Sequence, residues 1–189
     1  ARLALWMQEN VSGYKGPLTV SQFKGGQSNP SYRLDTPGHS YVLRRKPMGK
    51  LLPSAHAVDR EFRVISALYP TGYPVAKPWA LCTDDGVIGS MFYIMDAVEG
   101  RIFWNAQLPG LSNAQRREIF TAEVETLGRL HQLDYSALGL AEFGKTGNYF
   151  ARQIDRWTKQ YRASETEKNE TVERLIAFFN AKSNTARFH

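Results

Sequence analysis

The pattern of apolar and polar positions changes character near residue 110. Before that point, short stretches rich in Val, Tyr, Phe and Leu are separated by clusters of Gly, Pro and Asn, which is typical of strands joined by turns. The pattern predicts strands at residues 18–24, 31–35, 40–45, 75–82 and 87–96. After residue 110 the strand signals end and helical spacing replaces them, so the pattern predicts an α+β chain.

Helical spacing appears once within the strand-rich part, at residues 55–69. There Val58, Phe62, Ile65 and Leu68 recur at intervals of four and three, the spacing of one helix face. A short leading helix is predicted at residues 1–10. In the second part, helices are predicted at residues 113–133, 149–162 and 167–180.

The longest of these helices has a cap candidate, Ser112 or Asn113, and an apolar stripe. The stripe consists of Phe120, Val124, Leu127 and Leu130. We interpret His131, four residues after Leu127, as a buried structural histidine rather than a metal ligand, because no second His or Cys lies at ligand spacing.

The order of elements predicts two lobes. Residues 1–98 form a small five-stranded antiparallel lobe with one helix and a leading helix, residues 99–110 are a linker, and residues 111–189 begin a helical lobe. The composition is that of a globular protein, with 42% hydrophobic and 22% charged residues, and no apolar run reaches the roughly 18 residues of a membrane span. The single cysteine suits a reducing compartment, so we expect a cytoplasmic location and no membrane partner.

The net charge of +6 lies entirely in the first third of the chain. Residues 1–60 contain nine Lys or Arg and three Asp or Glu, whereas residues 61–189 contain fifteen of each. No run of Lys or Arg exceeds the three residues Arg44, Arg45 and Lys46. This favours a small phosphate-bearing ligand, and a nucleic-acid partner is not expected.

A Gly-rich turn is the first candidate for phosphate contact. Two adjacent glycines let the backbone approach a phosphate, and the polar residues after them can donate hydrogen bonds. The turn contains Gly25, Gly26, Gln27, Ser28 and Asn29. On its own this pattern is more often an ordinary turn, because it is neither a GxGxxG nor a Walker A loop.

The strand at residues 40–45 alternates, so Val42 and Arg44 share a face. Val42 on that face would cover the base of a nucleotide while Arg44 reaches its phosphates. Lys46 is the runner-up, and a solvated basic edge strand is an equally good reading of the same residues.

Glu61 lies beside the apolar stripe of the helix at residues 55–69, where a charge is costly unless it is paired. Arg44, on the preceding strand, is the natural partner. The alternative is an edge residue whose carboxylate simply reaches solvent.

The last predicted strand runs into the linker, and extended backbone between two lobes can pair with a purine edge. The alternative is a core strand followed by a turn. Farther along, we interpret Tyr149, Phe150, Trp157 and Tyr161 as core residues. Their cationic neighbours, among them Arg152, Arg156 and Arg162, could face an anionic substrate.

These pieces resemble the aminoglycoside phosphotransferase and choline kinase-like family, a branch of the protein-kinase-like fold. Within it they are most similar to the kinase-like domains fused to, or found alongside, acyl-CoA dehydrogenases. The likeness is carried by residues 23–32, 41–47, 51–56, 59–63, 127–131 and 160–165.

The resemblance implies a site for ATP or GTP with Mg²⁺. It implies that residues 25–29 form the nucleotide-positioning loop and that Arg44 stands where kinases usually place lysine, with Glu61 as its partner. Met95 would lie at the back of the adenine pocket, and the backbone of Asp96 and Val98 would bind the purine.

The family also requires a His-Gly-Asp catalytic loop and a later metal-binding Asp, and neither motif is present. The chain ends near where that loop would begin, and His189 could be its first residue. We therefore expect no catalytic or metal-binding residue in this chain, which alone should be inactive, and a complete, active parent protein.

The resemblance implies an ATP-dependent phosphotransferase acting on a hydroxyl of a small molecule, a hydroxyacyl compound more than an aminoglycoside. The alternative is a non-catalytic nucleotide-binding or regulatory module, a pseudokinase.

Overall fold

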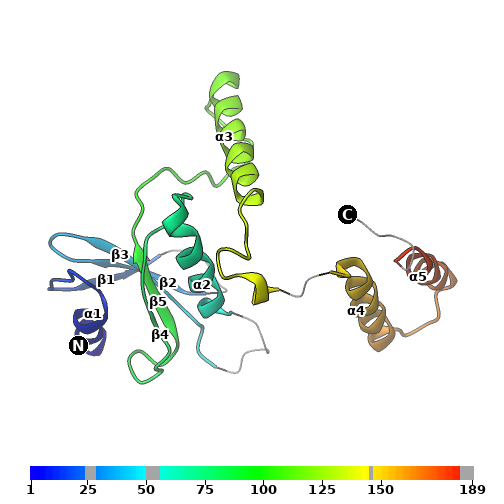
Figure 1. Cartoon of the computed structure of the whole chain (residues 1–189), viewed down its shortest axis with the longest axis horizontal. Coiled ribbons are helices and arrows are strands. Elements are labelled where there is room, and N and C mark those ends of the chain that lie inside the picture. Colours follow the sequence, from blue (N-terminus) through cyan, green and yellow to red (C-terminus); the bar gives the residue numbers. More distant parts are fainter. Residues whose placement is uncertain (24–28, 50–55, 145–146, 184–189) are drawn as a thin grey trace. The chain divides into compact units, whose positions relative to one another are not determined.

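The computed structural model describes residues 1–23, 29–49, 56–144 and 147–183 (Figure 1). The chain divides into two compact units, Ala1–Leu140 and Ala141–His189. The elements of the first unit are α1 (Arg2–Asn10), β1 (Thr19–Gln22), β2 (Ser31–Asp35), β3 (Ser40–Arg45), α2 (Val58–Leu68), η1 (Tyr69–Thr71), β4 (Pro78–Cys82), β5 (Phe92–Asp96) and α3 (Asn113–His131). Those of the second are η2 (Ala141–Phe143), α4 (Tyr149–Ser164) and α5 (Glu170–Ser183).

The first unit is built on a five-stranded antiparallel sheet with the order β1-β2-β3-β5-β4. The tight β2–β3 connection is closed by hydrogen bonds from the backbone N–H and the hydroxyl of Thr36 to the carbonyl of His39. The predicted five-stranded α+β lobe is confirmed, and the bounds of β2 and β3 agree with the prediction at every residue.

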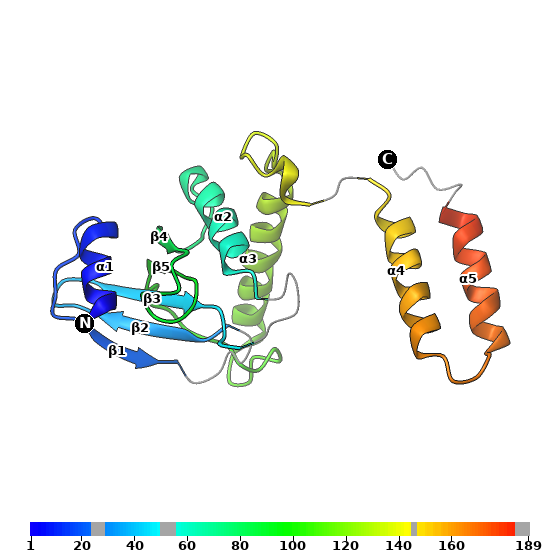
Figure 2. The same cartoon turned by 90° about the horizontal axis from the view of Figure 1, so that it is seen from below.

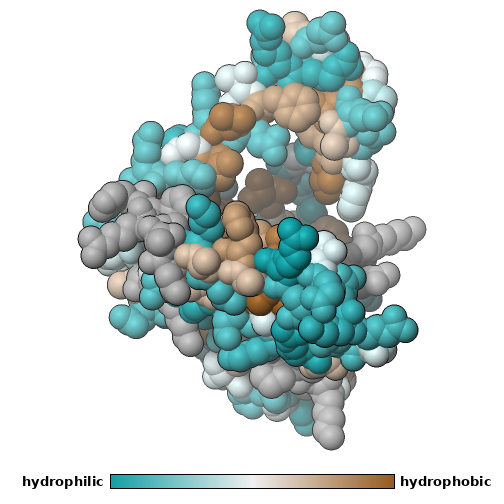
Figure 3. Space-filling view, turned by 90° about the vertical axis from the view of Figure 1, so that its right-hand side faces the viewer, coloured by the Kyte–Doolittle hydropathy of each residue, from teal (hydrophilic) through white to brown (hydrophobic). Residues whose placement is uncertain are grey.

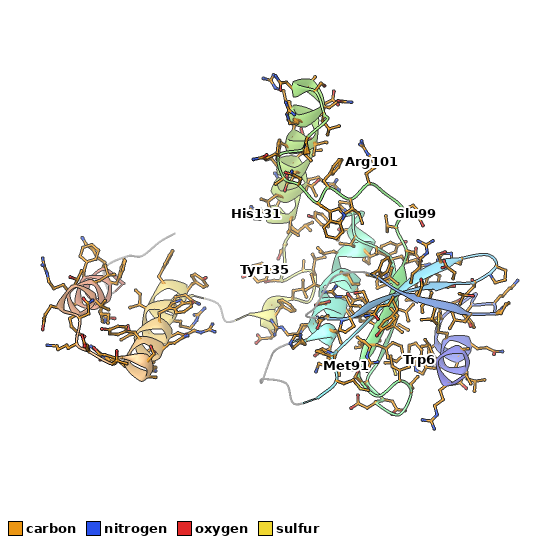
Figure 4. All side chains as sticks on the ribbon, turned by 180° about the vertical axis from the view of Figure 1, so that it is seen from behind. Trp6, Met91, Glu99, Arg101, His131 and Tyr135 are labelled. Carbon is orange, nitrogen blue, oxygen red and sulfur yellow. The ribbon has the colours of Figure 1, made fainter. Side chains whose placement is uncertain are left out.

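Helices cover both faces of this sheet at β5, whose first three residues are all buried. Phe92 faces α1, where its ring centroid lies 4.8 Å from that of Trp6. Tyr93, on the opposite face, lies 5.7 Å from the ring of Phe62 on α2. Figure 2 shows α1 and α2 packed against the strands, and Figure 4 labels Trp6 on α1. The core joins Met7 and the inward side chains of β2, β3 and β5.

The helix α2 starts three residues later than predicted, at Val58, which is fully buried. Acidic residues in its first turn, Asp59 and Glu61, interact favourably with the positive end of the helix dipole. The helix tightens into η1 at Pro70, and Gly72 then reverses the chain with a φ of 73°. This conformation suits glycine because it has no Cβ.

The predicted strand at residues 87–96 is wrong in its first half, because β5 begins only at Phe92. The carboxylate of Asp84 accepts a hydrogen bond from the backbone N–H of Gly86 (2.7 Å), and Gly89 N–H donates to Asp85 O (2.7 Å). These local bonds and the left-handed Gly89, with a φ of 86°, form a turn where the apolar pattern predicted extended chain.

The helix α3 begins with a capping box, in which Ser112 Oγ accepts from Gln115 N–H and the Gln115 side chain accepts from Ser112 N–H. Its apolar stripe is exposed, with Leu127 50% accessible. His131 is exposed too, so our interpretation of it as a buried histidine is wrong. Within the first unit the side chains of the stripe stay 36–68% exposed, and apolar side chains are visible in the upper part of Figure 3.

The second unit pairs α4 with α5 through Arg162, which binds the carboxylate of Glu173 with two nitrogens. Tyr161 is half-buried, but Tyr149, Phe150 and Trp157 are exposed, contrary to their interpretation as core residues. In the part of the chain that the structure describes, no helix combines the length and the apolar character that crossing a bilayer requires.

Replacement of Phe92 by Ala tests the position of the core. Because Phe92 has no exposed surface, we expect Phe92→Ala to lower the free energy of unfolding by about 3–5 kcal/mol in urea denaturation. Leu5→Ala removes a side chain that is 63% exposed and should change it by less than about 0.5 kcal/mol. Equal losses in the two variants would contradict this account of the core.

Candidate functional site

The strand register gathers a set of side chains on one face of the sheet. Val42 lies opposite Arg33 on β2 and Met95 on β5, and Arg44 lies opposite Ser31 and Tyr93. Directly opposed residues in antiparallel strands project from the same face. The prediction that Val42 and Arg44 share a face is therefore confirmed.

Arg44 and Glu61 form the ion pair that the sequence suggested. Arg44 Nε donates to Glu61 Oε2 at 2.6 Å, and Nη2 lies 3.4 Å from Oε1. The two side chains are 35% and 34% exposed, so the pair is partly solvated. The pairing rules out a free carboxylate at Glu61, and the position of β3 between β2 and β5 rules out a solvated basic edge strand.

The carboxylate of Glu61 accepts two further hydrogen bonds. Asn29 Nδ2 donates to Oε1 at 2.8 Å, and the Tyr93 hydroxyl donates to Oε2 at 3.2 Å. Asn29 is buried, and His56 Nδ1 lies 3.0 Å from its Oδ1. Glu61 is thus held by side chains from β3, β5 and the residue just before Pro30.

The ionisation of the cluster follows from these contacts. The pKa of Arg44 is raised, chiefly because its guanidinium donates hydrogen bonds to Glu61. Burial raises the pKa of the Tyr93 phenol, the negative charge of Glu61 raises it further, and the charge of Arg44 acts in the opposite direction. Tyr93 is therefore a neutral hydrogen-bond donor at neutral pH.

Arg44 keeps donors for an anion. A guanidinium carries five N–H groups, and Glu61 takes two of them while Ser31 Oγ lies 3.5 Å from Nη1. Within the described residues, two donors remain on a side chain that is partly exposed and locked in position. Such a fork suits a phosphate group.

The predicted purine-binding segment begins at Asp96, the last residue of β5. The backbone N–H of Asp96 bonds to Lys77 O at 2.9 Å, and its carboxylate accepts from Trp79 Nε1 at 2.5 Å. His39 Nε2 lies 2.8 Å from the same oxygen of Asp96. Val98 is exposed, and among the described residues neither its N–H nor its C=O has a hydrogen-bond partner. Met95 shares the face of Val42 and Arg44.

The Gly-rich turn is described only at its end. Asn29 lies beside Glu61, whereas Gly25, Gly26, Gln27 and Ser28 lie outside the described residues. The contact of Asn29 with Glu61 ties this end of the turn to α2.

The three arginines predicted to meet a substrate all lie on α4, in the second unit. Arg162 is bound by Glu173 and Glu165, and the hydrogen bonds to Glu173 raise its pKa. Arg152 donates to the carbonyl of Gly147, and Arg156 lies 6.0 Å from the centre of the Trp157 ring.

The described residues contain no preformed metal-binding cluster. No group of three or more His, Cys, Asp or Glu side chains among them could hold a metal ion.

Sequence reasoning missed three residues in or beside this site, Tyr93, Arg33 and His56. Tyr93 precedes Met95 by two residues, so strand parity could have placed it there. Arg33 was not singled out, yet it binds Asp35 (2.9 Å) and Glu99 (2.8 Å), the latter on the segment after β5 (Figure 4). His56 lies in one of the stretches that carry the family resemblance, but the sequence pattern assigns it no role.

An antiparallel five-stranded sheet with a helix whose glutamate pairs with a cation on β3 defines a protein-kinase-like fold. A sequence profile described as "Phosphotransferase enzyme family" matches residues 19–187. The chain belongs to this family.

Relatives of this chain carry acyl-CoA dehydrogenase names. Acyl-CoA dehydrogenase family member 11 of Homo sapiens is 45% identical over 166 residues, which cover 86% of this chain and 21% of that protein. Probable acyl-CoA dehydrogenase IBR3 of Arabidopsis thaliana is 50% identical over 167 residues, 84% of this chain and 20% of that protein. The chain thus spans about a fifth of the length of these curated relatives.

Two solved structures share its architecture. The crystal structure of a candidate aminoglycoside phosphotransferase from Ralstonia eutropha JMP134 is 49% identical, with a TM-score of 0.79 over 93% of this chain and 51% of that chain. Spectinomycin phosphotransferase APH(9)-Ia, in complex with ADP and spectinomycin, has a TM-score of 0.50 at 11% identity over 97% of this chain and 53% of that chain. The latter shares the fold alone.

The raised pKa of Tyr93 predicts a pH dependence of stability. The folded state binds the phenolic proton more tightly than the unfolded chain, whose tyrosines ionise near pH 10. This contribution is fully present below about pH 10 and is lost as the pH rises further. We expect Tyr93→Phe to flatten the fall in unfolding free energy between about pH 10 and 12.

The exposed Tyr135 supplies the control, because Tyr135→Phe should leave this pH dependence as it is in the wild type. Urea denaturation at each pH measures the slope. A Tyr93→Phe protein with the wild-type slope would mean that the phenol is not held neutral by the fold.

Proposed function

We propose that this chain provides the nucleotide site of an ATP-dependent phosphotransferase that acts on a hydroxyl group of a small molecule. The single observation that carries the proposal is the Arg44–Glu61 pair, which holds a guanidinium with spare donors beside Val42 and Met95. Membership of a phosphotransferase family supports it. GTP could replace ATP, because both carry the same phosphates.

Different residues of the site would contact different parts of the nucleotide. Arg44 would bind phosphate oxygens with the donors that Glu61 leaves free, and Glu61 would keep its fork in one orientation. Val42 and Met95 would contact the base, while the backbone of Asp96 and Val98 would meet its polar edge. Catalysis in phosphoryl transfer consists mostly of positioning and charge neutralisation, which is what such a site supplies.

The lobe boundaries belong to the same proposal. Residues 1–98 would form the nucleotide-binding lobe, residues 99–110 the linker and residues 111–189 the start of the helical lobe. The uncovered apolar side of α3 is consistent with a helix that belongs to a larger lobe.

The acceptor is proposed from the relatives. Because relatives at 45–50% identity are named as acyl-CoA dehydrogenases, we propose a hydroxyacyl compound in preference to an aminoglycoside. Arg152, Arg156 and Arg162 on α4 are the candidates for contact with an anionic acceptor.

Nucleotide binding gives the first test. We expect the chain to bind ATP in the presence of Mg²⁺ in isothermal titration, and Arg44→Ala to weaken binding at least about tenfold, since a charged hydrogen bond contributes about 1.5–3 kcal/mol. Arg45→Ala removes the same charge from the next residue of β3, whose side chain instead contacts Ser90, and should change affinity by less than about threefold. Equal weakening in both variants would contradict the role of Arg44.

Turnover gives the second test, on the natural protein that carries this sequence. An ATP-consumption screen over hydroxyacyl-CoAs, hydroxy acids, amino alcohols and aminoglycosides should show turnover with the first class. Arg44→Ala should reduce kcat/KM at least about tenfold. Unchanged turnover in that variant would overturn the assignment of Arg44, and turnover with aminoglycosides alone would overturn the proposed acceptor.

A further inference from the structure

We propose that His56 is a positioning residue of this site, because it fixes the orientation of the Asn29 carboxamide and, through Asn29, the carboxylate of Glu61. The effect of His56 on ATP binding rests on the proposed function. His56 itself is not proposed to touch the nucleotide.

The chemistry of the groups fixes the donor and the acceptor in both hydrogen bonds of Asn29, the one to Glu61 and the one to His56. Asn29 donates through Nδ2 to Glu61 Oε1 at 2.8 Å, so its Oδ1 points the other way, toward His56. A carboxamide oxygen only accepts, so His56 Nδ1, 3.0 Å away, must carry the proton. The contact is possible for the neutral Nδ1–H tautomer and for the imidazolium alike.

The burial of Asn29 makes the orientation matter. Its side chain is 5% exposed, so a carboxamide turned through 180° could not find water partners in place of the protein ones. The turned group would also bring Oδ1 against the carboxylate of Glu61, where two acceptors repel. His56 adds to this preference from the other end of the carboxamide, because its Nδ1–H would then face the Nδ2 amino group of Asn29, where two donors repel.

The backbone conformation of His56 indicates that the surrounding structure holds this residue in place. Its φ is 59°, in the left-handed region that side-chain-bearing residues adopt uncommonly. The N–H of Val58 donates to His56 O at 2.9 Å, which closes a turn immediately before α2. A strained residue that also makes a directed contact with a buried amide is a candidate for function.

The effect of His56 reaches Arg44 through Glu61, because the orientation of the Asn29 carboxamide decides whether Oε1 has a donor besides Arg44. The backbone of Asn29 is linked to the guanidinium as well, since the Ser31 hydroxyl donates to Asn29 O at 3.3 Å and lies 3.5 Å from Arg44 Nη1. We therefore expect His56 to set how well Arg44 is held for a phosphate.

Three substitutions separate hydrogen-bond polarity from packing. In His56→Asn the side-chain Nδ2 takes nearly the place of the imidazole Nδ1, donates in the same direction, and Asn tolerates a positive φ. His56→Asp has the same size and the same tolerance of a positive φ but only accepts. His56→Ala removes the contact altogether.

The first measurement is ATP affinity in the presence of Mg²⁺, by isothermal titration on the chain. We expect His56→Asn to bind within about threefold of the wild type and His56→Asp to bind at least about tenfold more weakly, with His56→Ala between them. Equal affinities in the Asn and Asp variants would overturn the proposal. This comparison stands even if His56→Ala does not fold, because the other two are matched in size.

The second measurement needs no nucleotide and separates this proposal from the proposed function. Proton exchange of the Asn29 carboxamide, followed by NMR, should be slow in the wild type and in His56→Asn and at least about tenfold faster in His56→Asp. If the wild type binds no ATP, the proposed function fails while this readout still decides the role of His56. Equal exchange rates in all variants would overturn that role.

Discussion

A single carboxylate, that of Glu61, joins helix α2 to β3, to β5 and to the residue that leads into β2. It accepts hydrogen bonds from Arg44, Tyr93 and Asn29. A partly exposed ion pair contributes only about 0–1 kcal/mol to stability, so this junction is better understood as a positioning device than as a source of stability. The stability of the sheet comes from the apolar side chains that cover both faces of β5.

The packing of helices on the two sides of the sheet determines which face remains for the proposed nucleotide site. Because α1 takes the side of the sheet with Phe92, the other side is left for Val42, Arg44 and Tyr93. Helix α2 covers only part of that side and brings Glu61 to its edge. The concentration of positive charge in residues 1–60 agrees with a polyanionic ligand at this face, although much of that charge is ordinary surface.

Much of this arrangement could be predicted from local rules. Stretches rich in Val, Tyr and Leu between turn-forming residues predicted the bounds of β2 and β3. Period-2 alternation placed Val42 and Arg44 on one face, and the cost of an unpaired charge beside an apolar stripe identified Glu61 and its partner Arg44. Family resemblance predicted the fold, which the structure and its relatives bear out. The roles of the Gly-rich turn and of the segment at Asp96 and Val98 stay predictions.

The wrong or missing predictions have a common cause. Each depends on packing partners distant in sequence or on individual side-chain hydrogen bonds, which leave no periodic pattern. An apolar stripe predicts a helix face that packs against a neighbour but not which neighbour, so His131 beside that stripe was expected to be buried and is exposed. The turn that Asp84 makes with Gly86 overrode an apolar run that predicted a strand. The contact of His56 with Asn29 spans 27 residues and leaves no periodic signal.

The account is tested most directly by a crystal structure of the protein with a non-hydrolysable ATP analogue. It predicts a phosphate oxygen within about 3 Å of the Arg44 guanidinium while the pair with Glu61 is retained, and the purine edge against the backbone of Asp96 and Val98. A nucleotide bound elsewhere, or bound here with Arg44 turned away from its phosphates, would contradict the central claim.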